Sequence, residues 1–389
     1  MRTLRQAPNL DYLKQQAKDL LAALRETQPG ASLADAQRTL AKQYGFRTWT
    51  DLKAEVERAR SKPQVFDADI AAGIAKSFGL GDVTEPAILI ETDVSGPSLR
   101  VQTHTGTWNA HAVMSGFDEG HAEESVRLMN AAGAAGIKTP RAVRTSSGVW
   151  VEEIGEYRWR VDKWMDVGPT IAVPVSSATA FKAGALLATL HGLRLEPAGG
   201  MHPWLAAKPR TGEQWQKILG IVESTGALWS RALADALPAI LDISAGHAEP
   251  PIDEHVLSHT DFQPSSTHLD KGDALVPVGW EFAGAIPPSW HLGLVLDSWS
   301  ATPDGEINVV AAKAIVEGYA SVGDVPPLDV SIFSPVITAW LNWLVSRMNH
   351  ALEGKGDARA NAERELAHML AHPKDRKAFE HLLRAAGVS

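Results

Sequence analysis

Acidic and histidine side chains gather in one segment of the chain, between residues 255 and 281. Asp261 follows His259 by two positions within the stretch 257–264, and Glu281 comes later. An ionised aspartate in a pocket can act as a general base, and a second carboxylate can hold a cation. These residue types indicate acid–base or cation-assisted chemistry, unless Asp261 only caps the backbone of its own loop.

Other chemistries have less support in the sequence. The chain has no cysteine, which excludes disulfides, thiolate metal sites and a cysteine nucleophile. Zinc is a weaker prediction, because only His259 and Asp261 lie close together among the candidate ligands. No nucleophile elbow, Walker loop or dinucleotide fingerprint occurs in a suitable context. Four histidines fall in or near this region: His255, His259, His268 and His291.

Three short amphipathic helices are predicted in residues 1–62, which carry 12 Lys and Arg against 7 Asp and Glu. Their apolar residues recur at helical spacing, and Ser32 and Thr48 each precede an aspartate by three positions, as in a capping box. Residues 61–63 are typical of a linker. We expect a docking or packing module rather than a DNA-binding one, because its basic residues are spread over all three helices.

The rest of the chain changes from strands to helices. Short β-rich stretches between residues 87 and 113 precede a helix over about residues 119–133, and more strands follow up to about residue 165. From about residue 176 the pattern is mainly helical. The sequence predicts a sheet with one inserted helix, followed by a larger helical part.

Four stretches, in this order, carry a resemblance to a known family: Lys138–Pro140, Gly184–His191, Leu257–Pro264 and Val276–Gly284. Together they resemble the aminoglycoside phosphotransferase and choline kinase family, which shares the protein-kinase fold, over about residues 70–300. The resemblance implies an α+β, bilobal fold with a small antiparallel-sheet lobe and a larger helical lobe. We expect the domains to be a helical module (1–62), a sheet lobe (63–169) and a helical lobe (170–389).

The family resemblance assigns roles to residues of the predicted helical lobe. It implies that Asp261 is the catalytic-loop aspartate and His259 the structural histidine beside it. Ser266 stands where the family has a metal-binding asparagine, and Gly279 where it has the magnesium-binding aspartate. Glu281 is retained, and on an extended chain it would point to the same side as residue 279 and could hold a cation.

The part of the resembled site that falls in the predicted sheet lobe is altered as well. His111 stands at or beside the position of the family's phosphate-binding lysine, and Glu123 or Glu124 is the candidate for the helix glutamate that pairs with it. The loop 92–98 would cover the phosphates. Its Pro97 lacks an amide donor and its Asp93 adds negative charge, so it is a poor phosphate cradle.

The substrate site of the resembled family lies in the helical lobe, near the catalytic aspartate. Trp280 and Trp290 are candidates for lining an apolar or cation-accepting cavity there, with Asp297 adding attraction for a cation. The chain has 13 tryptophans and a net charge of −9, of which residues 63–389 carry −14. This acidic balance suits a cationic small molecule and disfavours nucleic acid. The alternative is that these tryptophans only fill the core.

The replacements decide the functional prediction. Each missing electrostatic contact costs about 2.7–4 kcal/mol of transition-state stabilisation, and even half the sum for three is a thousandfold or more in rate. We therefore expect a small-molecule-binding protein whose phosphotransfer is lost or repurposed, with Asp261 as a possible acid or base. The alternatives are an active phosphotransferase of the antibiotic-resistance type, which alone would need ATP and magnesium, and a non-catalytic pseudokinase that binds a protein through its N-terminal module.

The sequence also bears on location. No apolar run approaches the roughly 18 residues that a membrane span requires, and the first residues do not resemble a secretory signal. We expect a cytoplasmic protein without a membrane partner.

Overall fold

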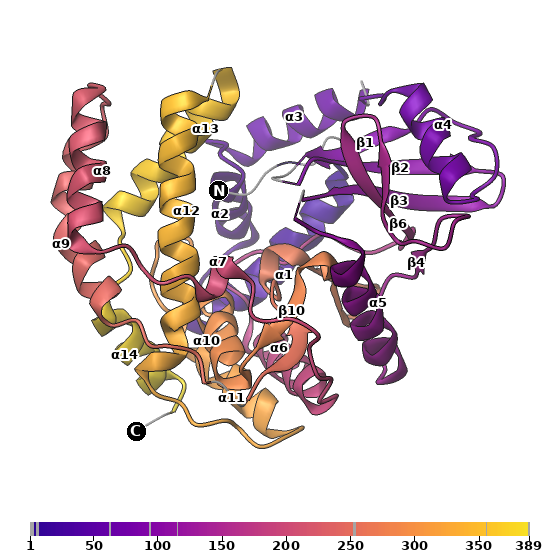
Figure 1. The fold of residues 1–389 in the computed structure, drawn as a ribbon. Coiled ribbons are helices and arrows are strands. Elements are labelled where there is room, and N and C mark those ends of the chain that lie inside the picture. The colour runs from indigo at the N-terminus through magenta and orange to yellow at the C-terminus, as the bar shows by residue number, and fades with distance from the viewer. Residues whose placement is uncertain are drawn as a thin grey trace.

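The computed structural model describes residues 4, 8–61, 64–92, 95–114, 116–251, 254–354 and 356–387. It has the predicted α+β fold, with an antiparallel sheet on one side of the molecule and a helical lobe on the other (Figure 1). Residues 62–63 of the predicted linker 61–63, and Asp93 and Val94 of the predicted phosphate loop 92–98, lie outside the described residues.

The N-terminal module consists of α1 (Leu10–Thr27), α2 (Leu33–Gln43) and α3 (Trp49–Ser61). Ser32 and Asp35 form the predicted capping box at the start of α2, and Thr48 and Asp51 make the same reciprocal bonds before α3. The three helices bury one small core, whose largest members are Leu13, Leu20, Leu40, Leu52 and Val56. The periodicity of the sequence therefore predicted this module correctly.

The sheet has the strand order β1-β2-β3-β6-β4, and β5 pairs with β6. Every pairing is antiparallel, and β3 runs beside β6 with His111 opposite Arg160. Its strands are β1 (Ile88–Thr92), β2 (Pro97–Thr103), β3 (Gly106–Val113), β4 (Ala142–Val143), β5 (Glu152–Ile154) and β6 (Tyr157–Lys163).

The two faces of the sheet differ in chemistry. One face is apolar, with Leu99, Ala110 and Trp159 packing against helix α4 (Ala68–Ser77). The other face carries His111 and Arg160 toward helix α5 (Glu119–Ala134). Because side chains alternate between the faces of a strand, apolar and charged residues that are neighbours in sequence separate onto opposite sides. Helix α4 has no counterpart in the sequence prediction.

Below the sheet, two small hairpin-like pairs carry the segment predicted to do chemistry. Strand β7 (Val256–His259) pairs with β10 (Ala283–Ile286), and β8 (Thr267–Leu269) pairs with β9 (Leu275–Pro277). Short 3₁₀ turns, η1 (Pro264–Ser266) and η2 (Trp280–Phe282), lie between them. Helix α5 packs on η2, β7 and β10, so it connects the sheet to this segment.

The helical lobe has one large core to which all of its long helices contribute. In Figure 1, α8, α9, α12 and α13 stand on the side of the molecule opposite the sheet. None of the described helices is both long and apolar enough to cross a lipid bilayer. The helices are α6 (Ser177–Gly192), α7 (Pro203–Ala206), α8 (Gly212–Ser224), α9 (Ser230–Ala245), α10 (Pro288–Trp299), α11 (Val309–Ala320), α12 (Ser334–Glu353), α13 (Gly356–Ala371) and α14 (Arg376–Ala385), with the 3₁₀ turn η3 (Val330–Phe333) before α12.

The closest helix packing in this lobe lies between α6 and α11, where Gly184 faces the backbone of the partner helix. A Cβ atom on Gly184 would lie 1.9 Å from the Ile315 carbonyl oxygen, so only glycine fits there. Gly192 belongs to the same helix, and nothing would lie within 4 Å of its Cβ atom.

We predict that Gly184→Ala destabilises the protein by about 1–3 kcal/mol, because α6 and α11 must separate to admit the methyl group. Gly192→Ala is the matched control and should be neutral or slightly stabilising, since alanine favours the helix. Urea unfolding followed by circular dichroism measures both. Equal stabilities of the two variants would contradict the prediction.

Candidate functional site

Asp261 lies in a loop that is anchored on several sides, here called the Asp261 loop (residues 260–266). The Thr260 hydroxyl donates to the Phe282 carbonyl at 2.5 Å, and the Trp299 indole N–H donates to the Phe262 carbonyl at 3.1 Å. Neighbouring elements therefore hold the backbone that carries Asp261.

The Asp261 carboxylate is itself oriented. Gln263 Nε2 donates to Asp261 Oδ1 at 2.7 Å, which fixes one oxygen of the half-buried carboxylate. Gly279 lies opposite, with φ = +82°, and a Cβ atom there would be 3.6 Å from Asp261 Oδ2. The position resembling the family's metal aspartate thus faces Asp261 directly and contributes no ligand.

His259 connects the Asp261 loop to this glycine segment. Its ring is buried, its Nε2–H donates to the Val278 carbonyl at 3.0 Å, and it meets Trp280 edge-on at a centroid distance of 4.8 Å. Burial lowers the pKa of His259 to about 4, so the imidazole is neutral at physiological pH. Through its bond to Val278, His259 joins the end of β7 to the glycine segment.

Ser266, predicted at the position of the metal-binding asparagine, is engaged with the loop backbone. Its hydroxyl donates to the Asp261 carbonyl at 2.5 Å and accepts from the Gln263 N–H at 3.4 Å. These bonds close the turn η1. The structure thus places Ser266 as a cap of the loop.

Glu281 lies near His111 for a different reason from the one expected. The sequence argument assumed an extended chain, but Gly279 is left-handed and residues 280–282 form the 3₁₀ turn η2. Side chains on such a turn do not follow the two-residue alternation of a strand, so that argument was wrong. Glu281 Oε2 nevertheless lies 3.8 Å from His111 Nε2.

His111 belongs to a set of ionisable groups that we call the buried charge cluster: His111, Arg160, Asp162 and Glu281. His111 Nδ1 lies 3.8 Å from Asp162 Oδ2, and Arg160 Nε lies 3.7 Å from Asp162 Oδ1. Arg160 is 1% exposed and Asp162 5%. The two carboxylates of the cluster are unfavourable neighbours for a triphosphate, because like charges repel.

Arg160 also ties three elements together. Its Nη1 donates to the Ser125 hydroxyl on α5 at 2.7 Å, and that hydroxyl donates to the Trp280 carbonyl at 2.7 Å. The guanidinium therefore joins β6, α5 and η2. The sequence analysis did not identify Arg160, Asp162 or Ser125. The available signal was the alternation along β6, in which the charged residues Arg160 and Asp162 follow the apolar residues Trp159 and Val161.

The predicted helix glutamates point elsewhere. Glu123 accepts from the Trp150 indole N–H at 2.6 Å and pairs with Arg144 at 3.0 Å, on the outer side of α5. Glu124 pairs with Arg127 at 3.6 Å. The structure does not bring either of them to His111, because Ser125 is the residue of α5 that faces the sheet.

The candidate pocket residues of the helical lobe lie in packed surroundings. Trp280 is buried, with its indole N–H bonded to the Pro277 carbonyl at 2.9 Å. Trp290 is buried against Leu205 and Ile286. Asp297 forms an ion pair with Lys374, which offsets its charge. These surroundings fit the alternative in which the tryptophans fill the core.

The arrangement does not fit magnesium-bound ATP. Gly279 offers no oxygen ligand, Ser266 is bound to its own loop, and His111 lies between two carboxylates instead of acting as a free cation. Among the described residues, no group of three or more His, Asp or Glu could hold a metal ion. The buried atoms His111 Nε2, Arg160 Nε and Asp162 Oδ1 have no hydrogen-bond partner within the described part of the chain.

Comparison with known proteins agrees with this fold. Residues 98–324 match the model of the phosphotransferase enzyme family, which is more than half of the chain, and the protein belongs to that family. Residues 3–74 match the model of a glyoxalase superfamily protein. No curated protein matches the chain.

Solved structures share the fold at low sequence identity. A spectinomycin phosphotransferase in complex with ADP and spectinomycin is 12% identical with a TM-score of 0.57, covering 83% of this chain and 99% of that one. An aminoglycoside phosphotransferase from Alicyclobacillus acidocaldarius is 17% identical with a TM-score of 0.51, covering 84% and 98%. A microcompartment-associated aminopropanol kinase is 16% identical with a TM-score of 0.55, covering 83% and 99%. The kinase-like fold predicted from the sequence is confirmed.

We predict that Arg160→Met costs about 3–5 kcal/mol of unfolding free energy, because Asp162 is left buried without its cation. Adding Asp162→Asn should restore part of the loss. Arg100→Met, on the exposed side of β2, is the control and should change stability by no more than about 0.5 kcal/mol. Urea titrations test all three. An Arg160→Met protein as stable as the control would show that the cluster does not join the elements.

A second prediction concerns three buried histidines. His191 is hydrogen-bonded to His291 at 3.0 Å, and burial lowers the pKa of His191 to about 3 and that of His291 well below its ordinary value. With His259, these rings stay neutral when folded but protonate near pH 6.5 when unfolded. The unfolded state therefore binds more protons below that pH, and stability falls as the pH decreases.

The expected slope from these groups is about 1.4 kcal/mol per pH unit for each histidine between about pH 6 and pH 5. Urea unfolding at pH 7.5, 6.0 and 5.0 measures it, with His104→Gln as an exposed control that should leave the slope unchanged. Histidine-ring NMR gives an independent check. A titration midpoint between pH 5 and 8 for any of the three rings would contradict the assignment.

Proposed function

We propose that this member of the phosphotransferase family binds a small molecule in the cleft between the sheet and the Asp261 loop, and that ordinary magnesium-ATP phosphotransfer is lost or repurposed. The observation that carries the proposal is the buried charge cluster. The place that the resemblance gives to a phosphate-binding lysine is taken by His111, which lies 3.8 Å from Asp162 on one side and 3.8 Å from Glu281 on the other.

The charge of the site favours a cationic ligand. The cluster places the carboxylates of Asp162 and Glu281 beside Arg160 and His111, and residues 63–389 carry a net charge of −14. In this proposal Asp261, oriented by Gln263, hydrogen-bonds an amine or hydroxyl of the ligand. In a repurposed enzyme the same carboxylate is the acid or base.

A working phosphotransferase is the second candidate. The oriented Asp261 and the family membership favour it, since a positioned carboxylate is one of the parts that phosphoryl transfer needs. It would require Glu281 to leave His111 and bind the metal. Pseudokinase action through the N-terminal module is the third candidate, and it needs no turnover.

We predict no magnesium-dependent increase in melting temperature with millimolar ATP or GTP. The triple variant His111→Lys, Ser266→Asn and Gly279→Asp should gain one, because it restores the cation and both ligands. A Cβ atom at position 279 would make only ordinary contacts, 3.6 Å from Asp261 Oδ2, and aspartate is one of the few non-glycine residues that adopt a left-handed backbone, at some cost in strain. Ligand at 100 times its Kd would stabilise the variant by about 2.7 kcal/mol.

Each single variant is the matched control and should bind nucleotide weakly or not at all. Magnesium-dependent stabilisation of the unmodified protein would refute the proposal and support the working phosphotransferase. Where a panel of amine-bearing small molecules gives a ligand that is turned over, Asp261→Asn should abolish turnover while the unfolding free energy is retained. Full activity in that variant would exclude Asp261 as the acid or base.

A further inference from the structure

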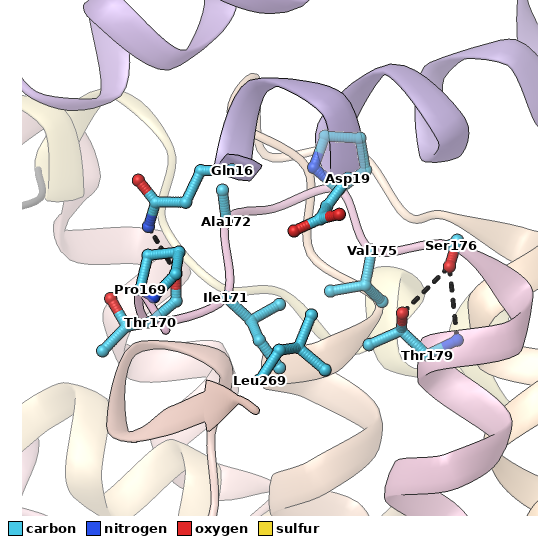
Figure 2. A pocket seen from close by; sticks show the side chains of 11 residues that line it. Gln16, Asp19, Pro169, Thr170, Ile171, Ala172, Val175, Ser176, Thr179 and Leu269 are labelled. Atoms are coloured by element: carbon cyan, nitrogen blue, oxygen red, sulfur yellow. Dashed lines mark hydrogen bonds between the residues drawn. The ribbon is translucent and has the colours of Figure 1, made fainter. Parts of the chain in front are cut away.

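The segment that joins the sheet to the helical lobe runs between two other parts of the chain. We call residues 164–176 the linking segment; they connect β6 to α6. Figure 2 shows helix α1 above this segment, with Gln16 bonded to Thr170, and the turn that bears Leu269 below it. One side of the linking segment thus faces the N-terminal module, and the other faces the end of the Asp261 loop.

Two glutamine side chains of the module bind the backbone of the linking segment. Gln16 Nε2 donates to the Thr170 carbonyl, and Gln43 Nε2 donates to the Val173 carbonyl. Gln16 is 2% exposed, and the Tyr44 hydroxyl donates to its Oε1 at 3.1 Å. A buried amide held from both ends is a specific contact, because its loss would leave polar groups unpaired.

Apolar and charged contacts extend this docking along the segment. Ala172 belongs to the core of the N-terminal module, although it lies far from that module in sequence. Glu26 at the end of α1 accepts from the Ser177 N–H at 2.9 Å and from its hydroxyl at 2.8 Å, at the N-terminus of α6. Tyr12 donates to Asp166 at 3.2 Å. The module therefore contacts the segment from its start to the first turn of α6.

On the opposite side, the linking segment is bonded to the chain that follows Asp261. The Ile171 N–H lies 3.0 Å from both the Pro264 and the Thr267 carbonyl oxygens, and the Gly168 N–H donates to Leu269 at 2.9 Å. The His268 Nδ1–H donates back to the Gly168 carbonyl at 2.7 Å. The linking segment therefore lies between the module and the chain that follows Asp261, and it is hydrogen-bonded to both.

The docking is polar and incompletely packed. A small pocket remains between α1, the linking segment and α6, with Gln16, Asp19, Val175 and Thr179 among its lining residues (Figure 2). Burial raises the pKa of Asp19 on the α1 side of this pocket. Contacts of this kind resemble interfaces between domains that can separate, rather than a continuous core.

We propose that the N-terminal module is a conformational clamp: when docked, it fixes the linking segment and, through it, the Asp261 loop. When the module undocks, Thr170 and Val173 lose their side-chain donors, Ala172 becomes exposed, and the strand-like bonds of Gly168 and Ile171 weaken. The clamp acts on the Asp261 loop whether or not that loop catalyses a reaction.

Hydrogen exchange of the full-length protein, followed by mass spectrometry, tests the clamp. The variant Gln16→Ala with Gln43→Ala should exchange about tenfold faster over residues 164–176 and 260–269, because two hydrogen bonds are removed from the segment. Gln15→Ala is the matched control on α1, since Gln15 bonds only to Asp19 of its own helix in the described structure, and it should exchange as the parent does. If the double variant exchanged hydrogen at the wild-type rate in both regions, the proposal would be overturned.

A second measurement separates undocking from unfolding of the module. The chain has no cysteine, so Ala172→Cys introduces a single thiol at a position that the docked module buries. Its labelling by a soluble disulfide reagent should be at least about tenfold faster in the double variant, while residues 10–61 keep their exchange protection. Ala183→Cys, buried in the helical lobe, should stay unreactive in both proteins. Equal labelling at position 172, or faster labelling only with loss of protection across residues 10–61, would overturn the clamp.

Discussion

The buried guanidinium of Arg160 is the constraint on which the cleft depends. A cation that is 1% exposed must find partners inside the protein, because leaving it unpaired there would cost several kcal/mol. It finds them in the Ser125 hydroxyl on α5 and in Asp162 on its own strand, and Ser125 passes the connection on to the Trp280 carbonyl. In the resembled family, a lysine–glutamate pair holds the helix to the sheet and also anchors phosphate. Here Arg160 and Ser125 join the helix to the sheet, and His111 lies between Asp162 and Glu281 at or beside the position that the resemblance gives to the lysine.

The loop that bears Asp261 shows the same difference between the bonds that hold its backbone and the residues at its expected ligand positions. Its framework is intact: His259, Thr260 and Trp299 each donate a hydrogen bond to a backbone carbonyl of this region. At the positions where the resemblance places metal ligands, the chain has Gly279, whose backbone is left-handed, and Ser266, which closes its own turn. A rigid loop with one oriented carboxylate can serve binding or proton transfer, neither of which needs the phosphate anchors.

The sequence could predict elements whose signals are local. Helical periodicity located the module and most of the helical lobe, and alternation located the strands of the sheet. It did not find α4, and it could not find Arg160 or Asp162, because alternate charged residues on a strand normally face solvent. Only the antiparallel register, which places Arg160 opposite His111, and the packing of α5 over that face turn them inward. Glu281 was expected in the cleft for a reason that the turn at residues 280–282 invalidates, and Glu123 points outward because α5 presents Ser125 to the sheet.

The same distinction between local and non-local information applies to the domain boundaries. A division at residues 62 and 169 follows composition and turn signals, and it remains a prediction about folding units. The packing crosses it, because Ala172 lies in the core of the first module while its neighbour Ile171 lies in the core of the helical lobe. Adjacent residues of an extended segment point to opposite sides, so one strand of chain can belong to two cores at once. Movement of either core must then displace the segment between them, and the Asp261 loop is bonded to that segment through the backbone of residues 264, 267 and 269.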